Sequence, residues 1–116
     1  LSTETDHIAP WKSTYTPSRL YAVPYRFVLS GSGHIAGVVN PPAAKKYCYW
    51  TNEKNPPTPD EWFQTSTRHE GSWWPDWTQW IAQYGGGMVP ARQPGDGKLK
   101  PIEAAPGSYV KVKATD

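Results

Sequence analysis

The residues of this chain best suited to acid–base chemistry are Asp6 and His34. A carboxylate beside an imidazole fixes the tautomer of the ring and directs it as a general base. If a strand ends just before Asp6, a helix over residues 10–21 runs back along the sheet and a strand over residues 25–29 returns. Asp6 and His34 then meet at the carboxyl ends of adjacent parallel strands, where open α/β sheets hold their ligands. From spacing alone, a turn cap and a surface histidine are the commoner interpretation.

The elements that position this pair follow from proline, glycine and aromatic residues. Pro10 suits the first turn of the helix over residues 10–21, and Pro24 ends it. Residues 25–29 (YRFVL) are typical of a buried strand, and the Gly/Ser turn after them leads to His34. This is the one clear strand of the sequence, so we expect a piece of a larger sheet with open edges.

Two further helices are predicted in the second half of the chain. Thr58 with Glu61 forms a capping box that predicts a helix ending at Gly71. Ser72 caps the next helix, which ends at the glycine run of residues 85–87. Apolar residues recur on one side of that helix, as in a helix packed through that side. The stripe consists of Trp73, Trp77, Trp80, Ile81 and Tyr84.

The tryptophan stripe has two interpretations. It is either the buried face by which the helix packs on the rest of the protein, or a platform for a polymer or glycan, since aromatic faces bind apolar rings and chains. Trp74 lies off the stripe and is the better candidate for an exposed contact. Beyond this helix, residues 88–106 are rich in Pro and Gly and predict an extended arm. Residues 108–113 alternate like an edge strand with lysines toward solvent.

Composition and charge exclude several classes of protein. Aromatic residues make up 14% of the 116 residues, so the core depends on rings more than on aliphatic side chains. The 12 Lys and Arg and 10 Asp and Glu are scattered, which leaves no footprint for nucleic acid. No apolar run is long enough to span a membrane, and no secretory leader is visible. No His, Cys and Asp set has metal-ligand spacing, so no metal site is predicted.

The ends of the chain and its single cysteine lead to two more expectations. The chain starts at Leu1 rather than at a methionine, and we interpret it as a processed product or an excised segment. Cys48 rules out an internal disulfide and favours a reducing compartment. His69 beside Glu70 is predicted to be a pair near a helix end, favourable at the negative pole of the helix.

Four stretches of the chain resemble one enzyme family. They are residues 5–11 (TDHIAPW), 26–42 (RFVLSGSGHIAGVVNPP), 70–77 (EGSWWPDW) and 101–110 (PIEAAPGSYV). These stretches resemble the C-terminal part of class I polyhydroxyalkanoate synthases, the poly(3-hydroxybutyrate) polymerases, and the resemblance spans nearly the whole chain. The stretch around His34 is specific to that family among α/β-hydrolase relatives.

The resemblance implies an α/β fold, namely the C-terminal part of an α/β-hydrolase fold. Its strand–helix–strand unit carries Asp6 and His34, and a helical, Trp-rich and extended appendage follows. Residues 1–50 would belong to the catalytic domain, residues 51–87 to the Trp-rich helical segment and residues 88–116 to the extended Pro/Gly-rich tail.

The resemblance further implies an acyltransferase that polymerises (R)-3-hydroxyacyl groups from their coenzyme A thioesters and releases coenzyme A. His34 matches the histidine that takes the thiol proton of a nucleophilic cysteine, and Asp6 matches the aspartate that helps to activate the 3-hydroxyl of the incoming unit. The family nucleophile lies on a Gly-x-Cys-x-Gly elbow upstream of the aspartate and is absent here. Cys48 follows His34 and has no such elbow, so it is interpreted as a partly buried small residue. The segment alone is therefore predicted to be inactive.

The remaining expectations concern substrate contacts and partners. His7 and Asn40 are candidate substrate-binding residues, against a loop role for His7 and a turn-stiffening role for Asn40. The family implies a coenzyme A thioester as substrate and no cofactor, a growing polyester chain, a homodimer of the full-length enzyme and granule-associated proteins as partners. It also implies a cytoplasmic location at the polyhydroxyalkanoate granule surface. The alternative hypothesis is a stand-alone Trp-rich module that binds carbohydrate or a polymer surface.

Overall fold

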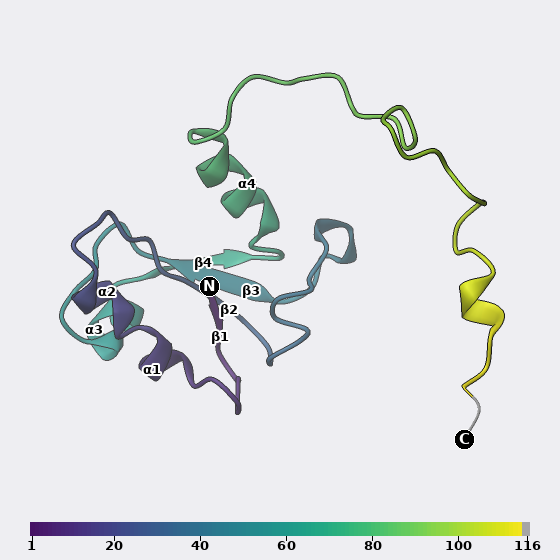
Figure 1. Ribbon diagram of the computed structural model, residues 1–116. Coiled ribbons are helices and arrows are strands. Elements are labelled where there is room, and N and C mark those ends of the chain that lie inside the picture. Colours follow the sequence, from purple (N-terminus) through teal and green to yellow (C-terminus); the bar gives the residue numbers. More distant parts are fainter. Residues whose placement is uncertain (115–116) are drawn as a thin grey trace. The chain divides into compact units, whose positions relative to one another are not determined.

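The computed structural model describes residues 1–114, which form two compact units divided after Gly85. The first unit is a mixed α/β structure with a four-stranded sheet in the order β1-β2-β3-β4 (Figure 1). Its elements are β1 (Ser2–Thr3), α1 (Trp11–Thr14), α2 (Pro17–Leu20), β2 (Val28–Ser30), η1 (Pro42–Ala44), β3 (Cys48–Thr51), α3 (Pro59–Gln64), β4 (Thr67–Glu70) and α4 (Trp74–Ala82). Helix α4 covers one face of the sheet, and α1 to α3 cover the other (Figure 1).

The sheet begins with the parallel pair that the sequence predicts. β1 and β2 run parallel, with Ser2 opposite Leu29 and Thr3 opposite Ser30. β3 then pairs antiparallel with β2, and β4 pairs antiparallel with β3. The expectation of one clear strand is therefore wrong. β3 and β4 have four residues each, which is too short for an alternating pattern to stand out, and they form because each finds a partner strand.

The first predicted helix is present in two pieces. The helix predicted over residues 10–21 consists of α1 and α2, and Pro17 is the first residue of α2. Proline has no N–H to donate to the preceding turn, so the hydrogen-bond ladder of α1 cannot pass through it. The predicted strand over residues 25–29 also starts later, at Val28, and ends at Ser30.

The N-cap at Thr58 is confirmed, and Glu61 Oε2 accepts from the Thr58 hydroxyl, but the helix behind the cap is shorter than predicted. The Glu61 N–H donates to Thr58 Oγ1 at 3.2 Å. Helix α3 then ends at Gln64 rather than at Gly71, because residues 67–70 form β4 and pair with β3. Gly71 follows this strand with a φ of +84°, a left-handed conformation that glycine adopts without strain and that turns the chain into α4.

The core of the first unit is aromatic, as the composition predicts. Trp62 of α3 is completely buried against Tyr15 and Phe27. Phe27 meets the Trp62 ring edge-on with ring centroids 4.9 Å apart, and it meets Tyr15 in the same way at 5.1 Å. Such edge-to-face pairs add to the free energy gained from area burial. The Tyr15 hydroxyl donates to the Pro56 carbonyl at 2.8 Å, so the buried ring keeps its polar end satisfied.

Helix α4 is fixed to the sheet by a charged pair. Arg26 donates from both terminal nitrogens to the Asp76 carboxylate, at 2.6 and 2.9 Å. This hydrogen-bonded pairing raises the pKa of the Arg26 guanidinium. Ser72 is not the N-cap as predicted, because the N-cap of α4 is Trp73, which makes no side-chain cap hydrogen bond. Ser72 lies one residue earlier, and its Oγ accepts from the Trp74 N–H at 3.1 Å. The start of α4 is thus held both by Ser72 and by the segment leading into β2.

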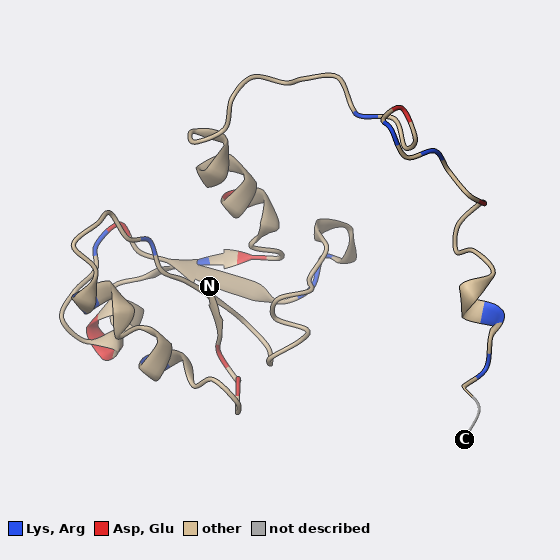
Figure 2. Cartoon of the chain, viewed as in Figure 1, with Lys and Arg blue, Asp and Glu red and all other residues tan. Residues whose placement is uncertain are grey.

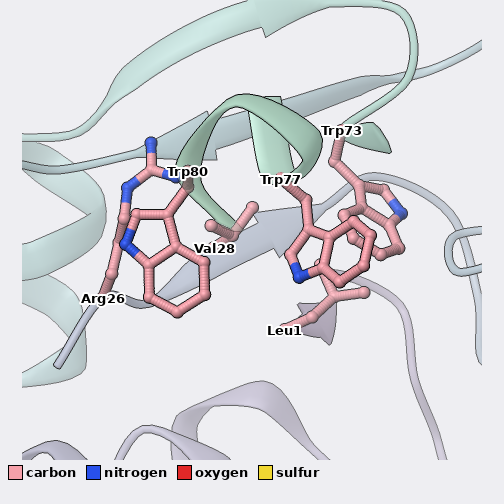
Figure 3. A pocket seen from close by; sticks show the side chains of 6 residues that line it. All are labelled: Leu1, Arg26, Val28, Trp73, Trp77 and Trp80. Atoms are coloured by element: carbon pink, nitrogen blue, oxygen red, sulfur yellow. The ribbon is translucent and has the colours of Figure 1, made fainter. Parts of the chain in front are cut away.

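The apolar side of α4 lines a cavity of about 230 Å³ over the sheet (Figure 3). The cavity is lined by Leu1, Arg26, Val28, Trp73, Trp77 and Trp80. Val28 faces this cavity while Leu29 joins the core on the opposite face, as the alternation of side chains along β2 requires. Trp77 is 48% exposed, so the interpretation of the stripe as a wholly buried face does not hold within this unit.

The second unit, from Gly86 onward, has little regular structure. Residues 88–106 lie outside helices and strands, and the extended arm predicted there stays a prediction. The edge strand predicted over residues 108–113 is wrong. Its centre is the short 3-10 helix η2 (Tyr109–Lys111), in which the Lys111 N–H donates to the Ser108 carbonyl at 3.0 Å. Alternation alone does not make a strand where no partner strand pairs with it.

Charged residues are spread along the chain rather than gathered in blocks (Figure 2). Lys and Arg occur in both units, and so do Asp and Glu (Figure 2). Within residues 1–114, no helix is both long and apolar enough to cross a bilayer.

Candidate active site

Asp6 and His34 meet beyond the carboxyl ends of β1 and β2. His34 Nδ1 lies 2.8 Å from Asp6 Oδ2. The parallel pairing continues past the strands into both loops, where the Thr5 N–H donates to the Ser32 carbonyl at 3.1 Å. The predicted strand–helix–strand path therefore does bring these two side chains together. Their roles in catalysis stay predictions.

The Asp6 carboxylate is held by hydrogen bonds on both oxygens. Oδ1 accepts from the Ile8 and Ala9 backbone N–H groups, each at 2.9 Å. Oδ2 accepts from the Thr3 hydroxyl at 3.2 Å and also faces His34. The Ala9 N–H, followed by the His34 side chain, holds the pKa of Asp6 well below its ordinary value. Asp6 is therefore a fixed and ionised acceptor.

The hydrogen bond to Asp6 also sets the tautomer of His34. An ionised carboxylate only accepts, so His34 Nδ1 must carry a proton. In the neutral ring, Nε2 then keeps the lone pair that can take a proton from a bound group. The His34 side chain is 47% exposed, whereas that of Asp6 is 8% exposed. The pair lines a cavity of about 190 Å³ together with Thr3, Ala9 and Val38, among other residues.

The turn that carries His34 closes on itself at Gly37. The Gly37 N–H donates to the Gly33 carbonyl at 2.9 Å, and Ser30 Oγ donates to the Gly37 carbonyl at 2.7 Å. A Cβ at position 37 would lie only 2.5 Å from Thr3 Cγ2. Glycine is therefore required here so that the turn can pack directly on the residue that supports Asp6.

The two predicted substrate contacts lie apart from the cavity beside His34. His7 is exposed, and it does not line that cavity. Asn40 is 2% exposed, and its Nδ2 donates to the Lys46 carbonyl at 3.0 Å, which ties the middle of the connection between β2 and β3 to its end beside β3. Substrate contact by either residue stays a prediction, and for Asn40 the structure gives a turn-stiffening hydrogen bond.

Two other residues singled out in the sequence are structural. Cys48 is buried on β3, where the sequence predicts a partly buried residue. His69 does not lie at a helix end as predicted, because residues 67–70 form β4. Its ring stacks on Tyr49 with centroids 4.7 Å apart, and Nε2 lies 2.8 Å from the Thr51 hydroxyl. These contacts join β4 to β3.

Sequence reasoning missed Thr3 and Gly37 as supporting residues. Thr3 stands three residues before Asp6, a spacing at which a hydroxyl can reach a neighbouring polar group, so this signal was present in the sequence. For Gly37 the sequence gives no signal of its contact with Thr3, because Thr3 lies on β1, far away along the chain. Among residues 1–114, no group of three or more His, Cys, Asp or Glu side chains could hold a metal ion.

The fold and this pair define an α/β chain in which a histidine and an aspartate meet beyond two parallel strands. No family model matches the chain. The poly(3-hydroxyalkanoate) polymerase subunit PhaC of Cupriavidus necator is 50% identical to it over 111 residues, which are 94% of this chain and 19% of that protein. The PhaC subunit of Rhizobium meliloti is 50% identical over 114 residues, or 98% of this chain and 18% of that protein.

A third relative matches the chain over a similar share of its length. The poly(3-hydroxyalkanoate) polymerase of Methylorubrum extorquens is 44% identical over 115 residues, which are 98% of this chain and 19% of that protein. The chain thus spans about a fifth of the length of the curated relatives it matches. Over nearly its whole length, this chain is a homologue of poly(3-hydroxyalkanoate) polymerases, and the resemblance seen in its motifs is confirmed.

Proposed function

We propose that this chain is the C-terminal segment of a polyhydroxyalkanoate synthase and supplies the histidine and aspartate of its active site. The observation that carries this proposal is the 2.8 Å contact between His34 Nδ1 and Asp6 Oδ2 beyond two parallel strands. The contact occurs in a chain whose sequence is 50% identical to two PhaC subunits. The first unit would complete an α/β-hydrolase domain whose nucleophilic cysteine lies outside this chain. The whole enzyme would join (R)-3-hydroxyacyl groups into polyester and release coenzyme A.

His34 would act as the base in the acylation step. Its Nε2 takes the proton of the cysteine thiol, and the thiolate attacks the carbonyl of the acyl-coenzyme A thioester. The bond to the coenzyme A sulfur breaks, and that sulfur recovers the proton from the imidazolium. The hydrogen bond from Nδ1 to Asp6 supports this role, because it keeps the lone pair on Nε2 and offsets the positive charge that the ring acquires.

Asp6 would matter more for elongation than for acylation. The 3-hydroxyl of the incoming unit is a far weaker nucleophile than a thiolate, so it depends more on an oriented base and on a nearby negative charge. The four hydrogen bonds to the Asp6 carboxylate and its lowered pKa keep that charge in place.

Substitution of the pair in the full-length enzyme tests these roles. His34→Ala is expected to reduce coenzyme A release by about a thousandfold or more, because the thiol loses its base. His69→Gln, at a histidine outside the pair, serves as the matched control and should retain coenzyme A release. A His34→Ala enzyme that kept turnover within a few fold of the parent would refute the proposal.

Asp6→Asn separates the two steps. A single-turnover burst of coenzyme A release should persist, while steady-state polymerisation slows strongly. Equal loss of the burst and of polymerisation would contradict this division of labour.

The lowered pKa of Asp6 gives a check that does not depend on activity. A carboxylate whose pKa is lower in the folded state stabilises the fold above its ordinary value of 3.8, and this contribution is lost as the pH falls further. The difference in unfolding free energy between the parent protein and Asp6→Asn should therefore shrink below about pH 4. Denaturation curves at several acid pH values measure this difference in unfolding free energy. A difference that stays constant down to about pH 2 would show that folding does not lower the pKa of Asp6.

The same proposal extends to the setting of the enzyme. We expect a homodimer of the full-length protein in the cytoplasm, at the surface of the polyester granule, with a coenzyme A thioester as substrate and no cofactor. Granule-associated proteins would be further partners. Light scattering of the purified full-length protein measures the oligomeric state, and microscopy of a fluorescent fusion measures the location in the cell.

A further inference from the structure

Two indole N–H groups at the start of α4 reach the turn that carries His34. Trp73 Nε1 donates to the Gly37 carbonyl at 3.1 Å and shares the Val38 carbonyl at 3.2 Å. Trp74 Nε1 donates to the same Val38 carbonyl at 2.9 Å. The two rings stand edge to face with centroids 6.5 Å apart. Two consecutive tryptophans therefore converge on two consecutive carbonyls of a distant segment.

These carbonyls belong to the turn that fixes the backbone of His34. The Gly37 N–H closes the turn onto Gly33, the residue just before His34. The Gly37 carbonyl also accepts from Ser30 Oγ on β2 at 2.7 Å. The turn is thus held by the sheet through Ser30 and by α4 through Trp73, and movement of Gly37 would displace the backbone on which the imidazole stands.

The turn is also coupled to the carboxylate. Gly37 packs so closely on Thr3 that a Cβ at position 37 would approach Thr3 Cγ2 to 2.5 Å. Thr3 donates to Asp6 Oδ2, the oxygen that faces His34 Nδ1. A shift of Gly37 would therefore disturb both partners of the 2.8 Å contact.

The helix that presents the indoles has its own attachment. The bidentate pair of Arg26 and Asp76, largely shielded from solvent, ties the first turn of α4 to the segment leading into β2. Trp73 and Trp74 therefore extend from a fixed support. Indole N–H is only a donor and keeps its proton at any pH of interest, so this restraint on the turn does not change with the ionisation of the site.

We propose that Trp73 and Trp74 are positioning residues that hold the His34 turn so that Nδ1 stays on Asp6. This inference rests on the proposed function of His34 as the general base. It also gives Trp74 a partner within the chain, in place of the exposed contact that the sequence predicts. Trp74 acts through the turn and touches no reacting atom.

The test is made in the full-length enzyme with Trp73→Phe and Trp74→Phe combined, which removes both N–H donors and keeps an aromatic ring at each position. The rate constant kcat for coenzyme A release should fall about tenfold, with KM changed less than about twofold, because a misplaced base impairs catalysis more than binding. Trp80→Phe is the matched control. It removes an indole from the same helix that donates to neither carbonyl, and it should stay within about twofold of the parent.

A second measurement follows the imidazole itself. In enzyme with ¹⁵N-labelled histidine, NMR reports the share of neutral His34 that carries its proton on Nδ1. This share should be high in the parent and in Trp80→Phe, and clearly lower in the double variant. An unchanged tautomer share in the double variant would overturn the proposal, whatever happens to kcat.

The NMR measurement also separates this proposal from the proposed function. If His34→Ala keeps full activity, the general-base role fails, while the tautomer share still tests the positioning role. If the double phenylalanine variant does not fold, 3-benzothienylalanine at both positions replaces each N–H by sulfur within a ring of nearly the same shape. A folded enzyme of that kind with parental kcat and parental tautomer share would overturn the proposal.

Discussion

Two tryptophans on successive helices of the chain have opposite environments. Trp62 of α3 is 0% exposed, whereas Trp77 of α4 is 48% exposed. Trp62 contacts the rings of Tyr15 and Phe27, which come from distant parts of the chain. Trp77 instead contacts the ring of Trp73, which lies four residues earlier at the start of the same helix. The comparison shows that an apolar stripe indicates which side of a helix can be buried, but the elements within reach decide whether it is.

The largest effect is expected from Trp62→Ala. Removal of this ring leaves a cavity among Tyr15 and Phe27 that the surrounding elements cannot fill. We expect a loss of about 3–5 kcal/mol of unfolding free energy. Chemical denaturation followed by far-UV circular dichroism measures it. A loss below about 1 kcal/mol would mean that the aromatic core does not stabilise the unit.

Gly37→Ala is expected to come next. The new Cβ would clash with Thr3 Cγ2 at 2.5 Å and with the Gly31 carbonyl at 2.7 Å. Overpacking of this kind costs about 1–3 kcal/mol. Gly86→Ala is the matched control, since a Cβ there meets nothing within 4 Å. Equal denaturation midpoints for the two variants would show that the turn has room to move.

A smaller effect is expected from Asp76→Asn, which weakens the attachment of α4. The pair with Arg26 is bidentate and mostly shielded from solvent, so its loss should cost about 1–2 kcal/mol. Asp60→Asn is the control, because the pair of Asp60 and Lys12 is more than half exposed and should contribute less than about 0.5 kcal/mol. Similar losses in both variants would argue that α4 is held by its apolar side instead.

The smallest effect is expected from Trp77→Ala. Nearly half of this side chain is already in contact with solvent, so the unfolding free energy should fall by less than about 1 kcal/mol. The measurement is the same denaturation experiment as for Trp62→Ala. A loss as large as that of Trp62→Ala would abolish the contrast between the two helices.

The parts of the fold that sequence predicts are those with local signals. The N-cap of α3 is set by Thr58 and Glu61, three residues apart, and it is found where predicted. The meeting of Asp6 and His34 follows from the lengths of a strand, a helix and a returning strand, quantities that chain geometry fixes. The lack of helices and strands over residues 88–106 follows from Pro and Gly, which disfavour regular structure.

The parts that sequence does not predict depend on distant partners. Residues 67–70 continue the chain after a capped helix, and they become β4 because β3 lies beside them. Residues 108–113 show the reverse case, an alternating pattern that forms no strand. The hydrogen bonds of Trp73 and Trp74 to a turn more than thirty residues away belong to the same class, since no spacing along the chain encodes them.

The outer strand of the sheet bears on how this chain behaves in concentrated solution. Among residues 1–114, β4 pairs with β3 alone, so its other side presents unpaired backbone groups to any strand that approaches. Arg68 and Glu70 on this strand are exposed and form an ion pair with each other. An approaching strand would have to strip water from both charges, which makes edge-to-edge association costly. The charged outer strand therefore protects the sheet against aggregation by strand addition along this edge.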